Sequence, residues 1–269
     1  MACLVNADGE VISTGRSSSS NPNNIGYEQA ALAIQQAVQE ALPSLHNPQI
    51  QSACLGIAGI ATKGHRAQLE ELLREQNWAK LIPFKITHDI EIALEGGLSG
   101  RPGICLISGT GSSCFGKDGQ GRTARSSGRS AGEDDPGSGY AIGLAACKSG
   151  MATLPSDDRD SVASIAPEVI TQAESGNVEA REILAINADA LGKLFLEVEA
   201  QLELRSPLEL VLAGGLLEND SLYSKLLKER IANSVPSILI HKPEGKAAEA
   251  AAMIAARLAV SGNEKRAPN

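Results

Sequence analysis

A turn of three small residues, Gly109-Thr110-Gly111, most constrains what this chain can fold into, because apolar segments at 103–108 and 113–117 flank it closely. That pattern predicts a β-hairpin. A glycine-bearing turn exposes its backbone N–H groups with little side-chain obstruction, so it can form a nest for phosphate oxygens. An ordinary hairpin is the alternative interpretation, because glycine is the default turn residue.

Asp89 follows an apolar segment at 83–88 that predicts a strand, and it precedes a helix predicted at 90–97. Carboxylates at the strand ends of α/β proteins point into clefts. A carboxylate placed there can accept a proton from a hydroxyl group as that hydroxyl attacks a phosphoryl group. The alternative is that Asp89 caps the helix, a position that aspartate favours strongly.

Elsewhere the apolar pattern predicts an α/β fold of two similar halves. Each half has a hairpin followed by alternating strands and helices, which would leave a cleft between the halves where ligands usually lie. The Ser/Asn/Pro-rich residues 17–24 are expected to be loop. Further strands are predicted at 2–5, 10–16, 50–58, 121–126, 208–215 and 236–241, and helices at 26–42, 65–77, 139–150, 221–234 and 244–259, with 160–204 mostly helical.

Composition excludes several classes of function. The chain has 269 residues and a net charge of -8, which suits two packed domains and argues against nucleic acid or an anionic membrane as the partner. The 5 cysteines have no CxxC spacing, so neither a disulfide framework nor a metal site is expected. No apolar run is long enough to cross a bilayer, and a cytoplasmic location is therefore expected.

Three features follow one another along the chain: Asp89, then "ICLISGTGSS" at 104–113, then "DDPGSGYAIG" at 134–143. This order and spacing resemble the N-acetylglucosamine kinase family, which belongs to the BadF/BadG/BcrA/BcrD-type ATPases of the actin/hexokinase/Hsp70 superfamily. "SNPNNIG" (20–26), "GIAG" (56–59) and "LAGGLLEN" (212–219) extend the resemblance over the rest of the chain.

The resemblance implies a two-domain ribonuclease-H-like fold with a cleft between the domains. The first domain would hold residues 1–100 and be completed by a C-terminal helix at 243–262, and the second would hold 101–242. The implied activity is the ATP-dependent phosphorylation of an amino sugar, N-acetylglucosamine or a related N-acetylated sugar, at its 6-hydroxyl. ATP and Mg²⁺ are the implied cofactors, the sugar is the implied small-molecule partner, and homodimers are common in the family.

The resemblance also implies roles for single residues. Asp89 matches the catalytic base, and Thr110 matches the threonine that contacts ATP. The other matching positions fall into two groups. Those implied to bind ATP are Gly109, Gly111, Gly214 and Gly215, and those implied to bind the sugar are Asn21, Asp89, Ser112, Ser113, Gly128, Arg129 and Asp135. Each contact has an ordinary alternative; Asn21, for example, could be a turn former, and the pair Gly214-Gly215 could be a strand end.

The chain departs from the family at its start. Family members open with a strand and an Asp-Gly-Gly-Gly-Thr-Lys-Thr loop that grips the β- and γ-phosphates, whereas "ACLVNADGEVISTG" here matches the segment that comes after that loop. Either the gene start is placed too late, or the chain is truly short and catalytically weak. The first explanation is preferred, because a missing strand would leave unpaired backbone groups at a sheet edge.

A second departure is Arg129, which stands where the family usually has tryptophan. A guanidinium in a sugar pocket can hold a carboxylate by two hydrogen bonds, so an acidic amino sugar becomes a candidate substrate. Arg129 pointing to solvent is the alternative.

Two rival functions remain. One is a sugar-binding or regulatory protein that has lost catalysis. The other is the ATPase activator of a 2-hydroxyacyl-CoA dehydratase, which needs cysteines for an iron–sulfur cluster; the scattered cysteines here argue against it.

Overall fold

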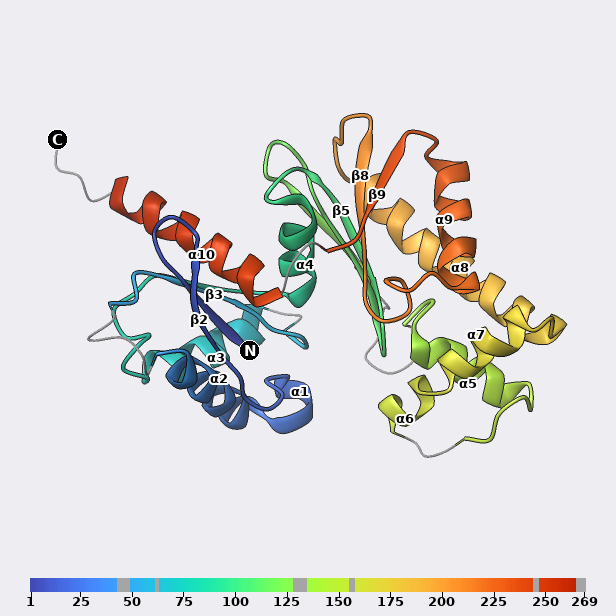
Figure 1. Cartoon of the computed structure of the whole chain (residues 1–269), viewed down its shortest axis with the longest axis horizontal. Coiled ribbons are helices and arrows are strands. Elements are labelled where there is room, and N and C mark those ends of the chain that lie inside the picture. Colours follow the sequence, from blue (N-terminus) through green and yellow to red (C-terminus); the bar gives the residue numbers. More distant parts are fainter. Residues whose placement is uncertain (43–48, 61–62, 128–134, 155–157, 244–246, 265–269) are drawn as a thin grey trace. The chain divides into compact units, whose positions relative to one another are not determined.

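The computed structural model describes the whole chain apart from residues 43–48, 61–62, 128–134, 155–157, 244–246 and 265–269. The chain forms two compact units (Figure 1). The first unit holds residues 1–99 and 244–269, and the second unit holds residues 100–243. No helix in the described ranges is both long enough and apolar enough to cross a membrane.

The second unit is built on a five-stranded sheet in the order β7-β6-β5-β8-β9. Its central strand, β5, pairs antiparallel with β6 on one side and parallel with β8 on the other. The outer strands continue this arrangement, with β7 antiparallel to β6 and β9 parallel to β8. The bounds are β5 Gly103–Ser108, β6 Ser112–Lys117, β7 Thr123–Ser127, β8 Leu208–Ala213 and β9 Ile238–His241.

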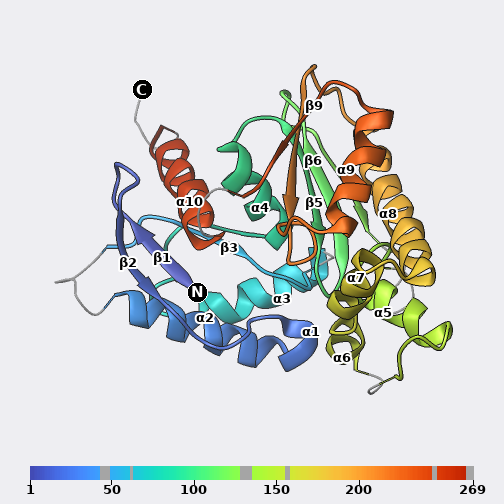
Figure 2. The same ribbon diagram turned by 45° about the vertical axis from the view of Figure 1, so that its right-hand side comes forward.

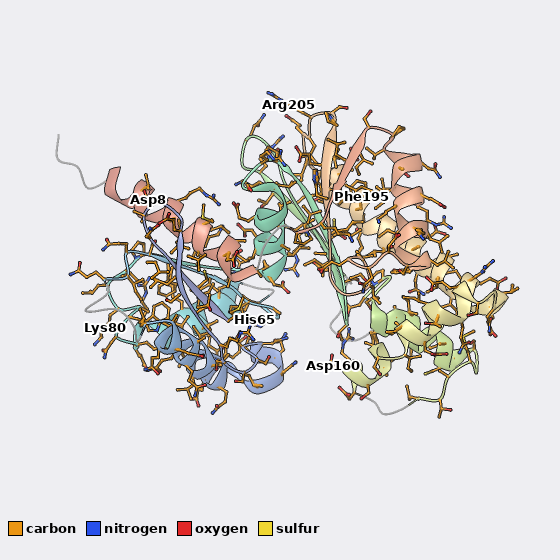
Figure 3. The ribbon with its side chains drawn as sticks, in the orientation of Figure 1. Asp8, His65, Lys80, Asp160, Phe195 and Arg205 are labelled. Carbon is orange, nitrogen blue, oxygen red and sulfur yellow. The ribbon has the colours of Figure 1, made fainter. Side chains whose placement is uncertain are left out.

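Helices cover one face of this sheet, and a single apolar core fills the space between (Figure 2). Ile104 and Leu106 alternate along β5 toward the helices and pack in the same cluster as Leu191 and Phe195 of the longest helix, α8. Phe195 is labelled in Figure 3. The helices are α5 Gly139–Lys148, α6 Arg159–Ala163, α7 Ala166–Glu174, α8 Val178–Glu199 and α9 Leu222–Ser234.

Side-chain caps explain where several of these helices begin. Ser138 accepts a hydrogen bond from the Ala141 N–H at the start of α5, and Asn177 accepts one from the Ala180 N–H at the start of α8. Ser221 and Ser224 form a reciprocal capping box on α9. The prediction that 160–204 is mostly helical is confirmed, because α6, α7 and α8 occupy most of this stretch.

The first unit has two separate two-stranded sheets, the antiparallel hairpin β1–β2 and the parallel pair β3–β4. Helices α2 and α3 lie on the opposite side of the strands from α10 (Figures 1 and 2). The strand bounds are β1 Ala2–Val5, β2 Val11–Gly15, β3 Ala53–Gly56 and β4 Phe84–Thr87. The helix bounds are α2 Tyr27–Ala41, α3 Lys63–Arg74, α4 Asp89–Leu98 and α10 Ala247–Glu264.

The prediction of loop throughout residues 17–24 is wrong at its end, where Pro22–Ile25 forms the short helix α1. Asn21 caps this helix by accepting a hydrogen bond from the Asn23 N–H at 3.0 Å. Proline suits the first position of a helix, because its missing N–H would have no partner there. The same residue types that indicate a loop therefore begin a helix here.

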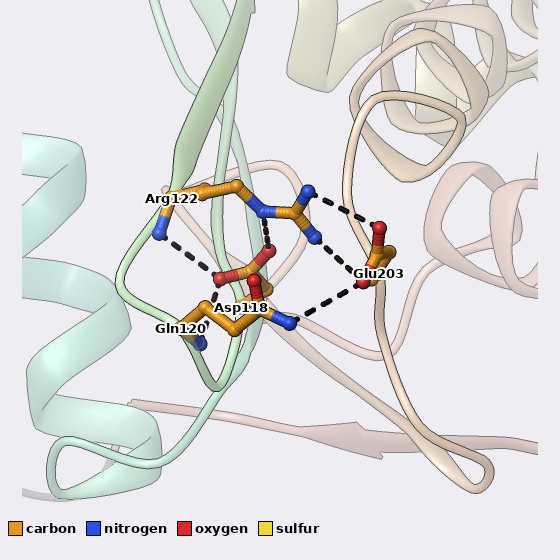
Figure 4. Close-up of polar contacts among 4 residues, drawn as sticks. All are labelled: Asp118, Gln120, Arg122 and Glu203. Atoms are coloured by element: carbon orange, nitrogen blue, oxygen red, sulfur yellow. Dashed lines mark hydrogen bonds and ion pairs between the residues drawn. The ribbon is translucent and has the colours of Figure 1, made fainter.

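The predicted turn after Lys117 is present and is built around the buried carboxylate of Asp118 (Figure 4). Its Oδ1 accepts hydrogen bonds from the Gln120 and Arg122 N–H groups at 2.9 and 3.0 Å, and its Oδ2 accepts one from Arg122 Nε at 2.6 Å. Arg122 also pairs with Glu203, which follows α8. Burial alone would raise the pKa of Asp118, but the hydrogen bonds from Arg122 and Gln120 lower it below its usual value.

We expect Asp118→Asn to remove a pH-dependent part of the stability of this turn. Because the pKa of Asp118 is lower in the folded state, the ionised carboxylate stabilises the fold. This stabilisation is present above about pH 4 and is lost as the pH falls through the folded-state pKa. Hydrogen exchange of the β6 and β7 amides should therefore differ between wild type and variant at neutral pH and converge in acid. The exposed Asp220→Asn is the control. A difference that stays constant with pH would contradict the expectation.

Candidate functional site

The candidate residues of the second unit gather where β5 and β8 end. These strands are parallel, so their carboxyl ends meet at one edge of the sheet. The predicted turn joins β5 to β6 here, and the Gly109 N–H donates to the Gly111 carbonyl at 2.9 Å. Thr110 is exposed at its tip. A Cβ placed on Gly109 would meet none of the described atoms within 4 Å, so this side of the turn is open.

The first turn of α5 is tied to the glycine turn. The Gly139 N–H donates to the Gly109 carbonyl at 2.7 Å, and the Tyr140 N–H donates to the Thr110 carbonyl at 3.2 Å. These bonds hold the positive end of the α5 helix dipole beside the turn, where a negative group is stabilised. The arrangement therefore suits an anion.

The segment that precedes α5 is held over the turn by three hydroxyl groups. Ser112 Oγ donates to the Pro136 carbonyl at 2.9 Å, while Ser108 Oγ and Tyr223 Oη donate to the Gly137 carbonyl at 2.8 and 2.6 Å. Burial raises the pKa of Tyr223, so this hydroxyl keeps its proton. Ser112 is thus used to position the loop, and its predicted contact with substrate stays a prediction.

Asp135 and Gly111, predicted separately, are neighbours: a Cβ on Gly111 would lie 3.3 Å from Asp135 Oδ2. The carboxylate forms an ion pair with Arg159 of α6. The guanidinium carbon of Arg159 lies 4.1 Å from the centre of the Tyr140 ring, close enough for a cation–π interaction. Within the described residues Arg159 Nη1 is buried without a hydrogen-bond partner.

Arg159 is the residue that sequence reasoning missed. It lies in a stretch whose pattern indicated helix and nothing more, and 24 positions separate it from Asp135. The one local signal is Asp158, which caps α6 and so places Arg159 at the first helical position.

The glycine pair after β8 meets the end of β5. Gly214 has a φ of 93° and passes so close to β5 that a Cβ would lie 2.3 Å from the Ser108 carbonyl oxygen. Its N–H donates to Glu218 Oε1 at 2.8 Å. Gly215 is exposed, and a Cβ there would meet none of the described atoms within 4 Å. The two glycines therefore differ: Gly214 is required by the fold, and Gly215 leaves open space.

In the first unit Asp89 is the first residue of α4 and follows β4 directly. The alternative that Asp89 caps the helix is wrong, because His88 occupies the cap position. The Asp89 side chain is exposed, and its Oδ1 accepts a hydrogen bond from the Ile90 N–H at 2.9 Å. A carboxylate in the first turn is stabilised by the helix dipole, so Asp89 is held ready and accessible.

Two other groups lie at this edge of the first unit. Asn23 Nδ2 donates to the carbonyl of Gly59, which follows β3, at 3.2 Å, and a Cβ on Gly59 would lie 2.2 Å from Asn21 Oδ1. Arg66 Nη2 lies 3.2 Å from Nε2 of His88, the neighbour of Asp89. Asp89 thus follows β4 at the carboxyl end of the parallel pair β3–β4, and Asn21, the cap of α1, lies beside Gly59, which follows β3. Their roles as ligand-binding residues stay predictions.

Two predicted residues, Gly128 and Arg129, lie outside the described residues. Ser113 is half-buried and its Oγ lies 3.3 Å from Arg125 Nε. Across the ranges that are described, no group of three or more His, Cys, Asp and Glu side chains could hold a metal ion.

The model of the BadF/BadG/BcrA/BcrD ATPase family matches residues 1–255. An N-acetylmuramic acid/N-acetylglucosamine kinase of Clostridium acetobutylicum is 28% identical over 88% of this chain and 88% of its own length. An N-acetyl-D-glucosamine kinase of Dictyostelium discoideum is 25% identical over 87% of this chain and 86% of its own length.

Among solved structures, a candidate N-acetylglucosamine kinase from Chromobacterium violaceum has a TM-score of 0.72 at 18% identity, covering 94% of this chain and 93% of its own. A ROK hexokinase from Thermus thermophilus has a TM-score of 0.59 at 18% identity, covering 95% and 94%. These likenesses confirm the predicted two-domain fold class of hexokinase-like α/β proteins.

We expect Gly214→Ala to destabilise the second unit and Gly215→Ala to leave its stability nearly unchanged, because only Gly214 lacks room for a side chain. Gly214→Ala forces a Cβ against the Ser108 carbonyl at a positive φ and should cost at least about 1–2 kcal/mol of the second unit's free energy of unfolding. Gly215→Ala should change it by less than about 0.5 kcal/mol. Hydrogen exchange of the β5 and β8 amides measures both, and equal costs would contradict this account.

Proposed function

Because this chain belongs to the BadF/BadG/BcrA/BcrD ATPase family, we propose that it is an amino-sugar kinase. It transfers the γ-phosphoryl group of ATP to the 6-hydroxyl of N-acetylglucosamine or a related N-acetylated sugar. Both curated relatives carry the name of an N-acetylated sugar kinase and match over most of their length. The observation that carries the proposal is the open glycine turn beside the Asp135–Arg159 pair at the end of β5.

The second unit supplies groups that suit ATP. The open side of Gly109 lets phosphate oxygens approach backbone N–H groups, Thr110 adds an exposed hydroxyl, and the α5 dipole favours the negative charge. Open space at Gly215 lets a nucleoside approach the backbone. Mg²⁺ would accompany ATP, since this ion is usually held by substrate phosphates with one or two carboxylates.

Asp89 would serve as the general base. Its exposed carboxylate accepts the proton of the sugar 6-hydroxyl as the hydroxyl oxygen forms its bond to the γ-phosphorus and the bond to ADP breaks. The fixed position of Asp89 at the start of α4 means that little reorganisation is needed, so its contribution comes from positioning as well as from proton transfer.

Asp135 would accept hydrogen bonds from sugar hydroxyls, and Arg159 would be its positioning residue. The ion pair holds the Asp135 carboxylate in one orientation, and packing on Tyr140 holds the guanidinium. The sugar could also be acidic, because Arg159 has a buried N–H group without a partner in the described part of the chain. Arg129 as a second cation for an acidic sugar stays a prediction.

We expect Asp89→Asn to lower kcat by about 10²–10⁴-fold while the KM for ATP changes little, because asparagine keeps the contact with the Ile90 N–H but cannot accept the proton. ADP release, measured over a panel of neutral and acidic amino sugars, gives both the substrate and the effect. Glu179→Gln, at an exposed acid in the first turn of α8, is the control.

ATP consumption with none of the amino sugars in that panel would overturn the proposed function. Calorimetry then identifies the rival, since a regulatory protein descended from such kinases would bind the sugar without binding nucleotide.

We expect Arg159→Gln to raise the KM for the sugar by about 10-fold and to leave the KM for ATP within about 2-fold, because a freed Asp135 loses its charge-assisted partner. Arg159→Lys should restore part of the loss, since it keeps the charge. Arg205→Gln, at an exposed arginine of the same unit (Figure 3), should have no effect. An equal rise in the KM for the sugar and the KM for ATP would show that Arg159 stabilises the fold and does not position the sugar-binding carboxylate.

A further inference from the structure

The candidate base Asp89 lies at a helix start that its cap residue does not secure. His88 occupies the cap position of α4, and its side chain makes no capping hydrogen bond. Asp89 Oδ1 accepts a hydrogen bond from the N–H of Ile90, its own neighbour, which does not tie the turn to the rest of the unit. The first N–H groups of a helix have no partner within the helix, so an uncapped end frays. Another contact is therefore needed to hold this turn.

Glu91, the third residue of α4, makes such a contact. Its carboxylate reaches back to β4, where it accepts a hydrogen bond from Thr87 Oγ1 and forms an ion pair with Lys85 Nζ. Its N–H donates to the His88 carbonyl at 3.2 Å. In a capping box the glutamate at this position bonds the N–H of the cap residue. Here it bonds side chains of the preceding strand instead, so the helix start is fastened to β4.

The strand places both partners of Glu91 on one face. Lys85 and Thr87 are two positions apart, so they project from the same side of β4. Ile86, between them, packs in the core with residues of α2 and α3 on the other side. Thr87 is only 1% exposed, and its carbonyl accepts a hydrogen bond from the Ile57 N–H at 2.9 Å. The hydroxyl that holds Glu91 is therefore itself fixed within the unit.

The rest of α4 is held by different contacts. A Cβ on Gly56 of β3 would lie 2.2 Å from Ile92 Cγ1, so the helix packs directly on that strand. One turn further on, Glu95 Oε1 pairs with Arg257 Nη2 of α10 at 2.6 Å. Glu91 and Glu95 thus hold two parts of the same helix against two different elements.

We propose that Glu91 is a positioning residue for Asp89: by joining the first turn of α4 to Thr87 and Lys85, it fixes the direction in which the Asp89 carboxylate projects. Residues two apart on a helix do not face each other, so Glu91 acts through the backbone. A displacement of about 1 Å in a reacting group can cost about 10²-fold in rate. The catalytic consequence rests on the proposed function, whereas the effect on the Asp89 side chain does not.

The surroundings of the two carboxylates suit this division of roles. Asp89 is exposed and lines a cavity of about 950 Å³ in the first unit, which β1, β3, α2 and α10 also line. Glu91 is half-buried, and its carboxylate is already engaged by two side chains. The helix dipole stabilises both acids, and Lys85 balances the charge of Glu91. The negative charge that remains open to a substrate is therefore that of Asp89.

The activity test separates kcat from KM. We expect Glu91→Ala to lower kcat by about 10–10²-fold and to change the KM for sugar and for ATP by less than about 2-fold, because binding groups stay in place while the base is misplaced. Glu91→Gln should recover most of the loss, since its amide oxygen can accept from Thr87 and Lys85. Thr87→Val should also lower kcat, and Thr87→Ser, which keeps the hydroxyl, should not. ADP release over a range of both substrates measures each value.

A second readout needs no turnover. The Ile90 amide reports on the Asp89 side chain, because it donates to Asp89 Oδ1. We expect its hydrogen exchange, followed by NMR, to speed up by about 3–10-fold in Glu91→Ala, as the loss of one hydrogen bond of typical strength implies. Glu95→Ala is the matched control: it removes a paired acid from the same helix and should leave both kcat and the Ile90 amide unchanged.

Three results would contradict the proposal. Unchanged Ile90 exchange and unchanged kcat in Glu91→Ala would mean that the first turn is held without Glu91. A loss in Glu91→Gln as large as that in Glu91→Ala would mean that the charge of Glu91 matters and its hydrogen bonds do not. An equal loss in Glu95→Ala would trace the effect to the stability of α4 as a whole.

The proposed function can fail separately. If the wild-type chain consumes no ATP with any amino sugar while Glu91→Ala still speeds exchange at Ile90, Glu91 orders the Asp89 side chain and the kinase activity is lost as an explanation. If the wild-type chain is an active kinase and Glu91→Ala matches it in kcat and in exchange, the kinase stands and Glu91 has no positioning role.

Discussion

The pairing of a central strand with a neighbour on each side is the interaction on which the rest of this structure depends. In the second unit β5 makes both pairings. The glycine turn follows the carboxyl end of β5 directly, and the Asp118 turn follows its partner strand β6. A backbone strand that is paired on both sides satisfies its polar groups while burying its side chains, so a continuous core can form. The first unit has two two-stranded sheets, β1–β2 and β3–β4, beside a cavity, and its apolar residues form separate clusters.

The same constraint explains why the candidate residues are clustered. Parallel strands end at a common edge, so residues far apart in the chain are delivered to one place: Ser108 with Gly214 in the second unit, and Gly59 with Asp89 in the first. The carbonyl of Gly137 then joins two distant elements by accepting hydrogen bonds from Ser108 and Tyr223. Asp135 is held beside Gly111 because the residues that follow it are fixed in this way.

Local signals predicted much of this accurately. The strands on either side of the glycine turn, the turn at Asp118 and the helix that follows Asp89 depend on short-range patterns of apolar residues, glycine and caps. Where local signals compete, sequence reasoning failed: Asn21 and Pro22 suit a loop and a helix start equally, and Asp89 suits a cap that His88 occupies instead. The roles of the candidate residues as ligands of ATP and sugar stay predictions.

The sequence by itself determined the family, the order of strands and helices, and the positions of the glycine turn and Asp89, because each rests on neighbouring residues and their spacing. Only the tertiary structure decided that Arg159 pairs with Asp135, that Gly214 passes too close to Ser108 for any side chain, and that β1 and β3 border a cavity. These facts arise from contacts between segments distant in the chain, which no local pattern records.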